Sequence, residues 1–228
     1  MAVAADLRRR AAAEFFGTAF LLATVIGSGI MGERLSGGNV AIALLANTIA
    51  TGAGLVAFIL AFESISAHFN PVVTVAAAAQ GDLRWRDVPV YVSAQTLGAF
   101  TGVAIAHVMF GVATFSVSTH ERSGIGQLVG EFVATFGLVT IIWGCARRRS
   151  TAVPFAVGAY ITAAYWFTSS TSFANPAVTV ARGFSNTFAG IRPIDVPGFV
   201  VVQFIAAIAA ASLFRWLLSV PSKSDVTD

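Results

Sequence analysis

The dipeptide Asn-Pro occurs in matching places in the two halves of this chain. Asn70-Pro71 lies in HFNPVVTVAAA and Asn175-Pro176 lies in FANPAVTVARG. An Asn side chain accepts a hydrogen bond from an unpaired amide at a helix start, and proline fits the first helical turn because its missing N–H would have no partner there. Each pair therefore predicts the start of a short helix, too brief to cross a bilayer.

The composition places these short helices inside a membrane protein. Of the 228 residues, 56% are apolar and only 11% are charged, which is too few charges to solvate a globular surface. Apolar runs of about 20 residues predict membrane-spanning helices. We expect six of them, at about residues 11–32, 39–61, 88–111, 124–146, 152–170 and 195–219.

The basic residues predict the orientation of the chain. Of its 14 Lys and Arg residues, ten fall on one side of the six-span arrangement and four on the other. Basic residues concentrate on the cytoplasmic side, so we expect a multi-pass protein of the plasma or bacterial inner membrane with both termini in the cytoplasm. The ten are Arg8, Arg9, Arg10, Arg84, Arg86, Arg147, Arg148, Arg149, Arg215 and Lys223, and the four are Arg34, Arg122, Arg182 and Arg192. This asymmetry accounts for the net charge of +3, and nucleic-acid binding is not expected.

The two halves of the chain form an internal repeat within one predicted domain, residues 1–228. AEFFGTAFLL is echoed by GEFVATFGLV, and HFNPVVTVA by FANPAVTVA, so that the repeats cover about residues 11–111 and 124–219. Each repeat holds three spans and one short helix. An odd number of spans inverts the second copy in the membrane, which brings the two short helices together near the bilayer midplane.

This arrangement predicts a pore. With each Asn oxygen occupied as a helix cap, the amide groups of Asn70 and Asn175 are free to donate into the lumen. The unwound segments before them should supply carbonyl acceptors along one wall. The candidates in these segments are His68, Phe69, Thr171, Phe173 and Ala174. A cation would meet two positive helix ends and could not recover its hydration energy, so we expect uncharged solutes to pass.

Two carboxylates lie inside predicted spans, Glu14 and Glu131, at equivalent places in the repeats. They could brace the unwound segments by accepting backbone amides, with Gln95 and Gln203 as further braces, or they could relay protons. We favour the brace, because the spans offer almost no titratable partners for a relay. His68 and the single cysteine, Cys145, are interpreted as packing residues. No metal site, cofactor or catalytic group is expected, and the chain is not expected to be an enzyme.

The whole pattern resembles the aquaporin or major intrinsic protein family. The resemblance is carried by AEFFGT, AHFNPVVT, YVSAQTLGA, GEFVATF and FANPAVT, and it extends over essentially the whole chain. It implies an all-α membrane protein with six transmembrane helices and two re-entrant half-helices, in two inverted repeats. It also implies one pore per subunit and assembly as a homotetramer in membrane lipid.

The departures from the family pattern concern the predicted filter. Val178 stands where most members have arginine, and the resemblance places Thr51, Ala163 and Ser172 at the other constriction positions. None of the four is charged and all are small, which implies a wide constriction. Val72 follows the first Asn-Pro, where alanine is usual as in Ala177; it could either trim the lumen or pack against a neighbouring span.

The valine positions are similar to those of a bacterial branch of the family associated with arsenical resistance. The resemblance implies a passive channel for arsenite, methylated arsenicals, glycerol and water. One alternative is an ordinary water or glycerol facilitator. A second, from a different class, is an ion-coupled secondary transporter, which would need a charged coupling site within the membrane.

Overall fold

The computed structural model describes residues 6–147 and 149–217. Every regular element in these residues is helical. In chain order they are α1 (Leu7–Leu35), α2 (Val40–Phe62), α3 (Pro71–Gln80), η1 (Trp85–Asp87), α4 (Val88–Phe110), α5 (Ile125–Ala146), η2 (Ser150–Ala152), α6 (Val153–Phe167), α7 (Pro176–Arg182) and α8 (Val196–Leu217).

The helices match the predicted spans, with one of them shorter than expected. Among the described residues, α1, α2, α4, α5 and α8 are long and apolar enough to cross a membrane. The predicted span 152–170 becomes α6, which has 15 residues and ends at Phe167. Arg148, Lys223 and the last two residues of the predicted span 195–219 lie outside the described residues.

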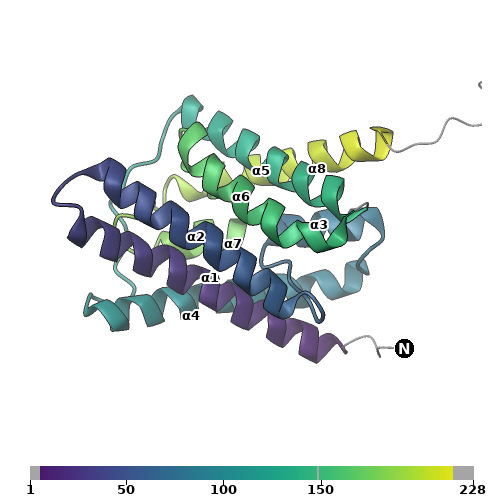
Figure 1. Cartoon of the computed structure of the whole chain (residues 1–228), viewed down its shortest axis with the longest axis horizontal. Coiled ribbons are helices and arrows are strands. Elements are labelled where there is room, and N and C mark those ends of the chain that lie inside the picture. Colours follow the sequence, from purple (N-terminus) through teal and green to yellow (C-terminus); the bar gives the residue numbers. More distant parts are fainter. Residues whose placement is uncertain (1–5, 148, 218–228) are drawn as a thin grey trace, which may run out of the picture.

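The packing follows the repeat. Helix α1 packs against α2 and α4, just as α5 packs against α6 and α8, and α2 meets α6 where the halves join. The short helices α3 and α7 both contact α4 of the first half and α8 of the second half. They lie among the long helices in Figure 1, and both described ends of the chain lie at the same end of the bundle.

The closest helix contact is made by α1 and α4. Gly98 and Gly102 are buried in α4, and a Cβ atom at either would collide with the backbone carbonyl oxygen of Phe15 or Ala19 in α1. Small residues one turn apart allow helix backbones to approach in a membrane. This contact fixes the first half around its short helix.

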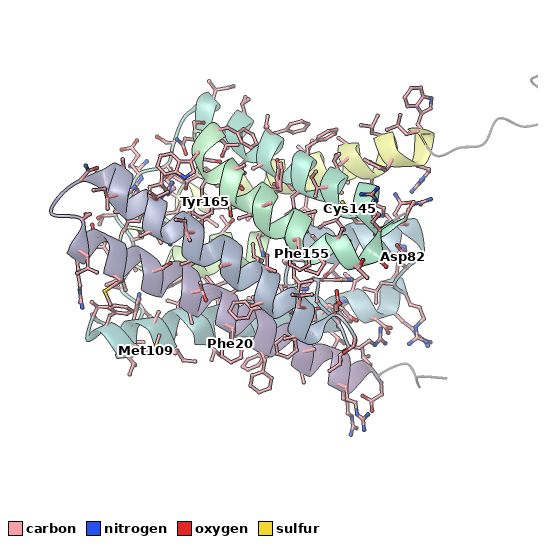
Figure 2. All side chains as sticks on the ribbon, viewed as in Figure 1. Phe20, Asp82, Met109, Cys145, Phe155 and Tyr165 are labelled. Carbon is pink, nitrogen blue, oxygen red and sulfur yellow. The ribbon has the colours of Figure 1, made fainter. Side chains whose placement is uncertain are left out.

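The outer surface of the bundle is apolar. Large side chains such as Phe20, Leu97 and Val108 are 52%, 62% and 71% exposed, respectively. Phe20 points away from the bundle in Figure 2. Such a surface suits lipid or a neighbouring subunit and would be unfavourable in water.

Candidate functional site

One cavity of about 1000 Å³ runs between the two halves of the bundle. It is lined by Arg10 and Asp82 toward one end, by Asn70 and Asn175, and by Tyr165 farther along. In Figure 2, Asp82 lies at the end of the bundle where the described chain ends lie, and Tyr165 lies nearer to the opposite end. The cavity therefore extends along the bundle past both short helices.

Both short helices begin as predicted, at the proline after each asparagine. Asn70 Oδ1 accepts a hydrogen bond from Val72 N at 3.0 Å. Asn175 Oδ1 accepts from the amides of Ala177 at 3.1 Å and Val178 at 3.3 Å. Pro71 and Pro176 occupy the first helical positions and are buried. The caps fix the orientation of both amide groups at the cavity.

The two asparagines also tie the halves together. Asn70 Nδ2 donates to the carbonyl oxygen of Ala174 at 2.7 Å, and Asn175 Nδ2 donates to that of Phe69 at 2.8 Å. The sequence predicted that both amide groups were free for the lumen, and this is wrong for one N–H of each. An amide has two N–H donors, so the second of each asparagine remains for a solute.

The carbonyls that accept these bonds belong to residues with an uncommon backbone. Phe69 has φ of 51° and Ala174 has φ of 47°, and in the second segment Thr171 and Ser172 also have positive φ, 60° and 54°. Non-glycine residues in this region cost about 1–3 kcal/mol each and need support from the surrounding structure.

Glu14 supports the first unwound segment. It is fully buried, and its carboxylate accepts hydrogen bonds from Ser66 Oγ, from the amides of His68 and Phe69, and from Gln95 Nε2, at 2.5–2.8 Å. Four donors on one carboxylate satisfy its oxygens and hold the loop backbone in place. This is the geometry of a brace.

Glu131 repeats the arrangement in the second half. Its carboxylate accepts from the amides of Phe173 at 2.8 Å and Ala174 at 2.9 Å, and from Gln203 Nε2 at 2.6 Å. Gln203 also donates to Thr179 Oγ1 in α7, as Gln95 does to Thr74 Oγ1 in α3. Each carboxylate thus connects a long helix, an unwound segment and a short helix.

Three of the four predicted constriction residues line the cavity: Thr51, Ser172 and Val178. The placement of Ala163 there is wrong, because Ala163 lies on the exposed face of α6. Tyr165 occupies the cavity wall instead, and its hydroxyl donates to Thr51 Oγ1 at 3.3 Å. Tyr165 is two residues after Ala163 in α6. Two residues correspond to a rotation of about 200° around the helix axis, so the two side chains lie on opposite faces.

Val72 packs rather than trimming the lumen. It is fully buried in an apolar cluster with Tyr91 and Trp143. The next residue, Val73, lines the cavity. The second of the two alternatives for Val72 therefore fits the structure, and Ala177 is likewise buried in the apolar core.

Arg182 was not predicted as part of the site. It is 2% exposed and lines the cavity with Ser172 and Phe173. Its guanidinium carbon lies 3.4 Å from the centre of the Phe173 ring, and its Nε donates to the carbonyl oxygen of Ala189. Its spacing from Val178 could have predicted this place. Residues four apart share a helix face, and Val178 is four residues before Arg182.

A second arginine reaches the same ring from the connection between α4 and α5. The guanidinium carbon of Arg122 lies 4.9 Å from the centre of the Phe173 ring. Its Nε donates to Gly190 O at 2.8 Å, and its Nη1 donates to Ser170 O and Thr171 Oγ1 at 3.2 and 3.3 Å. Burial lowers the pKa of Arg122 to about 10, so the group stays charged at neutral pH.

His68 makes contacts within the protein. Its Nδ1 lies 3.1 Å from Thr74 Oγ1, and its ring centre lies 5.3 Å from that of Tyr91. Among residues 6–147 and 149–217, no three His, Cys, Asp or Glu side chains are grouped as a metal site would require. His68 is also part of the cavity wall.

Comparisons with known proteins agree with this geometry. The profile of the family described as "Major intrinsic protein" matches residues 1–171. The chain is 52% identical to the aquaglyceroporin AqpS of Rhizobium meliloti over 214 residues, which are 93% of this chain and 91% of that protein. It is 34% identical to aquaporin NIP1-1 of Zea mays over 167 residues, 71% of this chain and 58% of that protein.

A solved structure has the same fold. The aquaglyceroporin from Plasmodium falciparum superimposes with a TM-score of 0.71, and the alignment covers 92% of this chain and 96% of that chain. The identity is 17%, so this likeness bears on the fold alone.

Proposed function

Because this chain belongs to the major intrinsic protein family, whose members are membrane channels rather than enzymes, we propose that it is a passive channel for water, glycerol and neutral metalloid hydroxides such as arsenite and methylated arsenicals. A multi-pass channel for water and small solutes follows from the family. The choice among these solutes is inferred from the cavity wall.

The observation that carries the proposal is the mixed character of this wall. Leu21, Val25 and Val178 present apolar surface, whereas Asn70, Asn175 and Ser172 present polar groups. Ser172 Oγ is buried and has no hydrogen-bond partner in the described structure. A polyol or a small neutral oxyacid can exchange its hydration for such groups while its apolar side faces valine and leucine.

Val178 is the residue most directly tied to solute size. It stands where the family pattern has arginine, and it is smaller and uncharged. Tyr165 lines the cavity in place of the predicted Ala163 and has a larger side chain. We therefore propose that the passage owes its width to Thr51, Ser172 and Val178.

Liposomes containing the wild type, Val178→Arg or Val178→Leu test this proposal by stopped-flow entry of water, glycerol and arsenite. Val178→Arg should lower glycerol and arsenite entry by about tenfold or more, equivalent to about 1.4 kcal/mol of barrier, and water entry much less. Val178→Leu adds volume without charge and should have a smaller effect. Equal fluxes through all three proteins would exclude Val178 from the filter.

We also propose that the protein is a homotetramer in the plasma or inner membrane with both termini in the cytoplasm. The apolar outer surface of the bundle and the shared location of the two described chain ends support this arrangement. An ion-coupled transporter would need a charged residue that could bind a coupling ion. Glu14 and Glu131 have their oxygens occupied by protein donors, which disfavours that role.

A further inference from the structure

Arg182 is a buried charge without a counter-ion. Within the described chain, no carboxylate lies within ion-pair distance of the Arg182 side chain, and its hydrogen bond is made by Nε alone. The two terminal amino groups have no protein acceptor there. A buried guanidinium needs partners for its donors. Because Arg182 lines the cavity, water or a solute in that cavity can supply them.

The guanidinium is also held in a fixed place. The Phe173 ring and the Ala189 carbonyl contact it from two different segments. Phe173 is itself fixed, because its backbone N–H donates a hydrogen bond to Glu131 Oε1 and the centre of its ring lies 5.3 Å from that of Phe199. A cation over an aromatic face is attracted by the ring, and more strongly when it is desolvated.

The position of Arg182 differs from that of the arginine in the family pattern. Four residues of helix rise about 6 Å, so Arg182 lies one turn beyond Val178 along α7 on a similar face. Val178 and Ser172 line the same cavity as Arg182 and carry no charge. The charge is therefore carried by a different residue from those of the uncharged constriction.

We propose that Arg182 supplies the positive charge and the hydrogen-bond donors that select solutes at this part of the cavity, and that Phe173 holds its guanidinium in place. This rests on the proposed channel function. Small solutes with oxygen acceptors gain a hydrogen bond there, and cations are repelled there. The constriction is thus wide at Val178 without losing its selectivity against cations.

Thiol modification tests the charge at this place. Ser172→Cys in a Cys145→Ser background puts one thiol on the cavity wall, and it is treated with a negatively and a positively charged methanethiosulfonate. Each rate is divided by the rate of that reagent with a free thiol. With Arg182 present, the negative reagent should react about tenfold faster, because a fixed charge raises the local concentration of counter-ions by that order.

Two further variants separate Arg182 from the general charge of the surface. Arg182→Gln should lower the rate ratio severalfold, with Arg122 accounting for any remainder because its guanidinium lies over the same Phe173 ring, and it should raise methylammonium entry into liposomes about tenfold. Arg192→Gln is the control, because Arg192 is already paired with Glu121 and Asp195 and should leave the ratio unchanged.

The proposal is overturned by a ratio of one or less with Arg182 present, whether or not Arg182→Gln folds. It is equally overturned if folded Arg182→Gln keeps the wild-type ratio and excludes methylammonium as well as the wild type does. Water and glycerol entry in the same liposomes report on the channel function separately. A wild type that conducts these solutes but fails the charge test would refute only the role of Arg182.

Discussion

At the scale of single residues, two buried carboxylates are each held by several hydrogen bonds. Glu14 and Glu131 are fully buried, and in the described chain neither forms an ion pair with a basic side chain. Hydrogen bonds from backbone amides and from a glutamine stabilise them instead. Because several of these donors are backbone amides of the two unwound segments, the carboxylates hold those segments in place.

Glu131→Gln should destabilise the protein by about 2–4 kcal/mol, because one carboxylate oxygen becomes an NH₂ group facing N–H donors. Thermal unfolding in detergent measures this loss, and glycerol entry into liposomes should fall with it. Glu33→Gln is the control, since Glu33 is exposed near the end of α1. A melting temperature of Glu131→Gln equal to that of Glu33→Gln would contradict the role of Glu131 as a brace.

Residues close to the Asn-Pro pairs could be predicted from the sequence, but the residue that α6 contributes to the cavity wall could not. The caps and the two carboxylates depend on local patterns, which the repeat shows twice. Ala163 was placed by counting back from Asn175 through a segment with positive φ at Thr171, Ser172 and Ala174. Such a segment does not preserve helical phase, so counting could not show that Tyr165 faces the cavity.

At the scale of elements, the short helices depend on their asparagines twice over, as helix caps and as links between the halves. Asn175→Ala removes both the cap of α7 and the bond to Phe69 O. We expect it to cost about 1–2 kcal/mol for the cap and about as much again for the lost link. Thermal unfolding measures the total, and water entry should change as well.

Asn39→Ala provides the matched control for that substitution. Asn39 caps α2 by accepting from Ala41 N and Ile42 N, and it lies on the exposed surface. Its replacement should cost only the cap, about 1 kcal/mol, and leave water entry as in the wild type. If the two variants were equally stable and equally permeable, the link between the halves would be energetically unimportant.

Asp195 links the segment that follows α4 to the segment that follows α7. Its charge makes the stability of the protein depend on pH. Burial raises the pKa of Asp195, but hydrogen bonds from the Arg192 guanidinium and the Arg122 amide outweigh it and hold the pKa below its usual value. A lowered pKa in the folded state stabilises the protein above the unfolded value of about 3.9, and this stabilisation is lost as the pH falls through the folded value.

Asp195→Asn should therefore lower the melting temperature at pH 7, and its difference from the wild type should shrink below about pH 4. Asp82→Asn, at an exposed position at the other end of the bundle, serves as the control and should show little difference at either pH. A difference between Asp195→Asn and the wild type that stays constant from pH 7 to pH 3 would contradict this role.

Most elements were predictable because each has a local cause. Apolar runs gave the long helices, and the Asn-Pro pairs gave the short ones. The exception is α6, which stops at Phe167 instead of continuing to residue 170. Residues 168–174 instead form the unwound segment that supplies the Ala174 carbonyl. This carbonyl makes a tertiary contact with Asn70, and such a contact cannot be predicted from the pattern of apolar residues.

At the scale of the whole molecule, the inverted repeat explains why one chain can enclose a passage. The asparagine of each half donates a hydrogen bond to a backbone carbonyl of the other half, so both halves are needed to form the cavity at this point. The polar groups thereby face a cavity inside the bundle, and the apolar side chains face outward, where lipid would contact them. Arg182 lines one part of this cavity, and Arg10 and Asp82 line the end where the described chain ends lie.

The central claim is that this passage conducts uncharged solutes down their own gradients. Stopped-flow entry of glycerol into liposomes, measured with and without ionophores that collapse proton and sodium gradients, tests it most directly. We predict entry well above that of protein-free liposomes, proportional to the glycerol gradient and unchanged by the ionophores. Entry that requires an ion gradient, or no entry above the protein-free rate, would contradict the account.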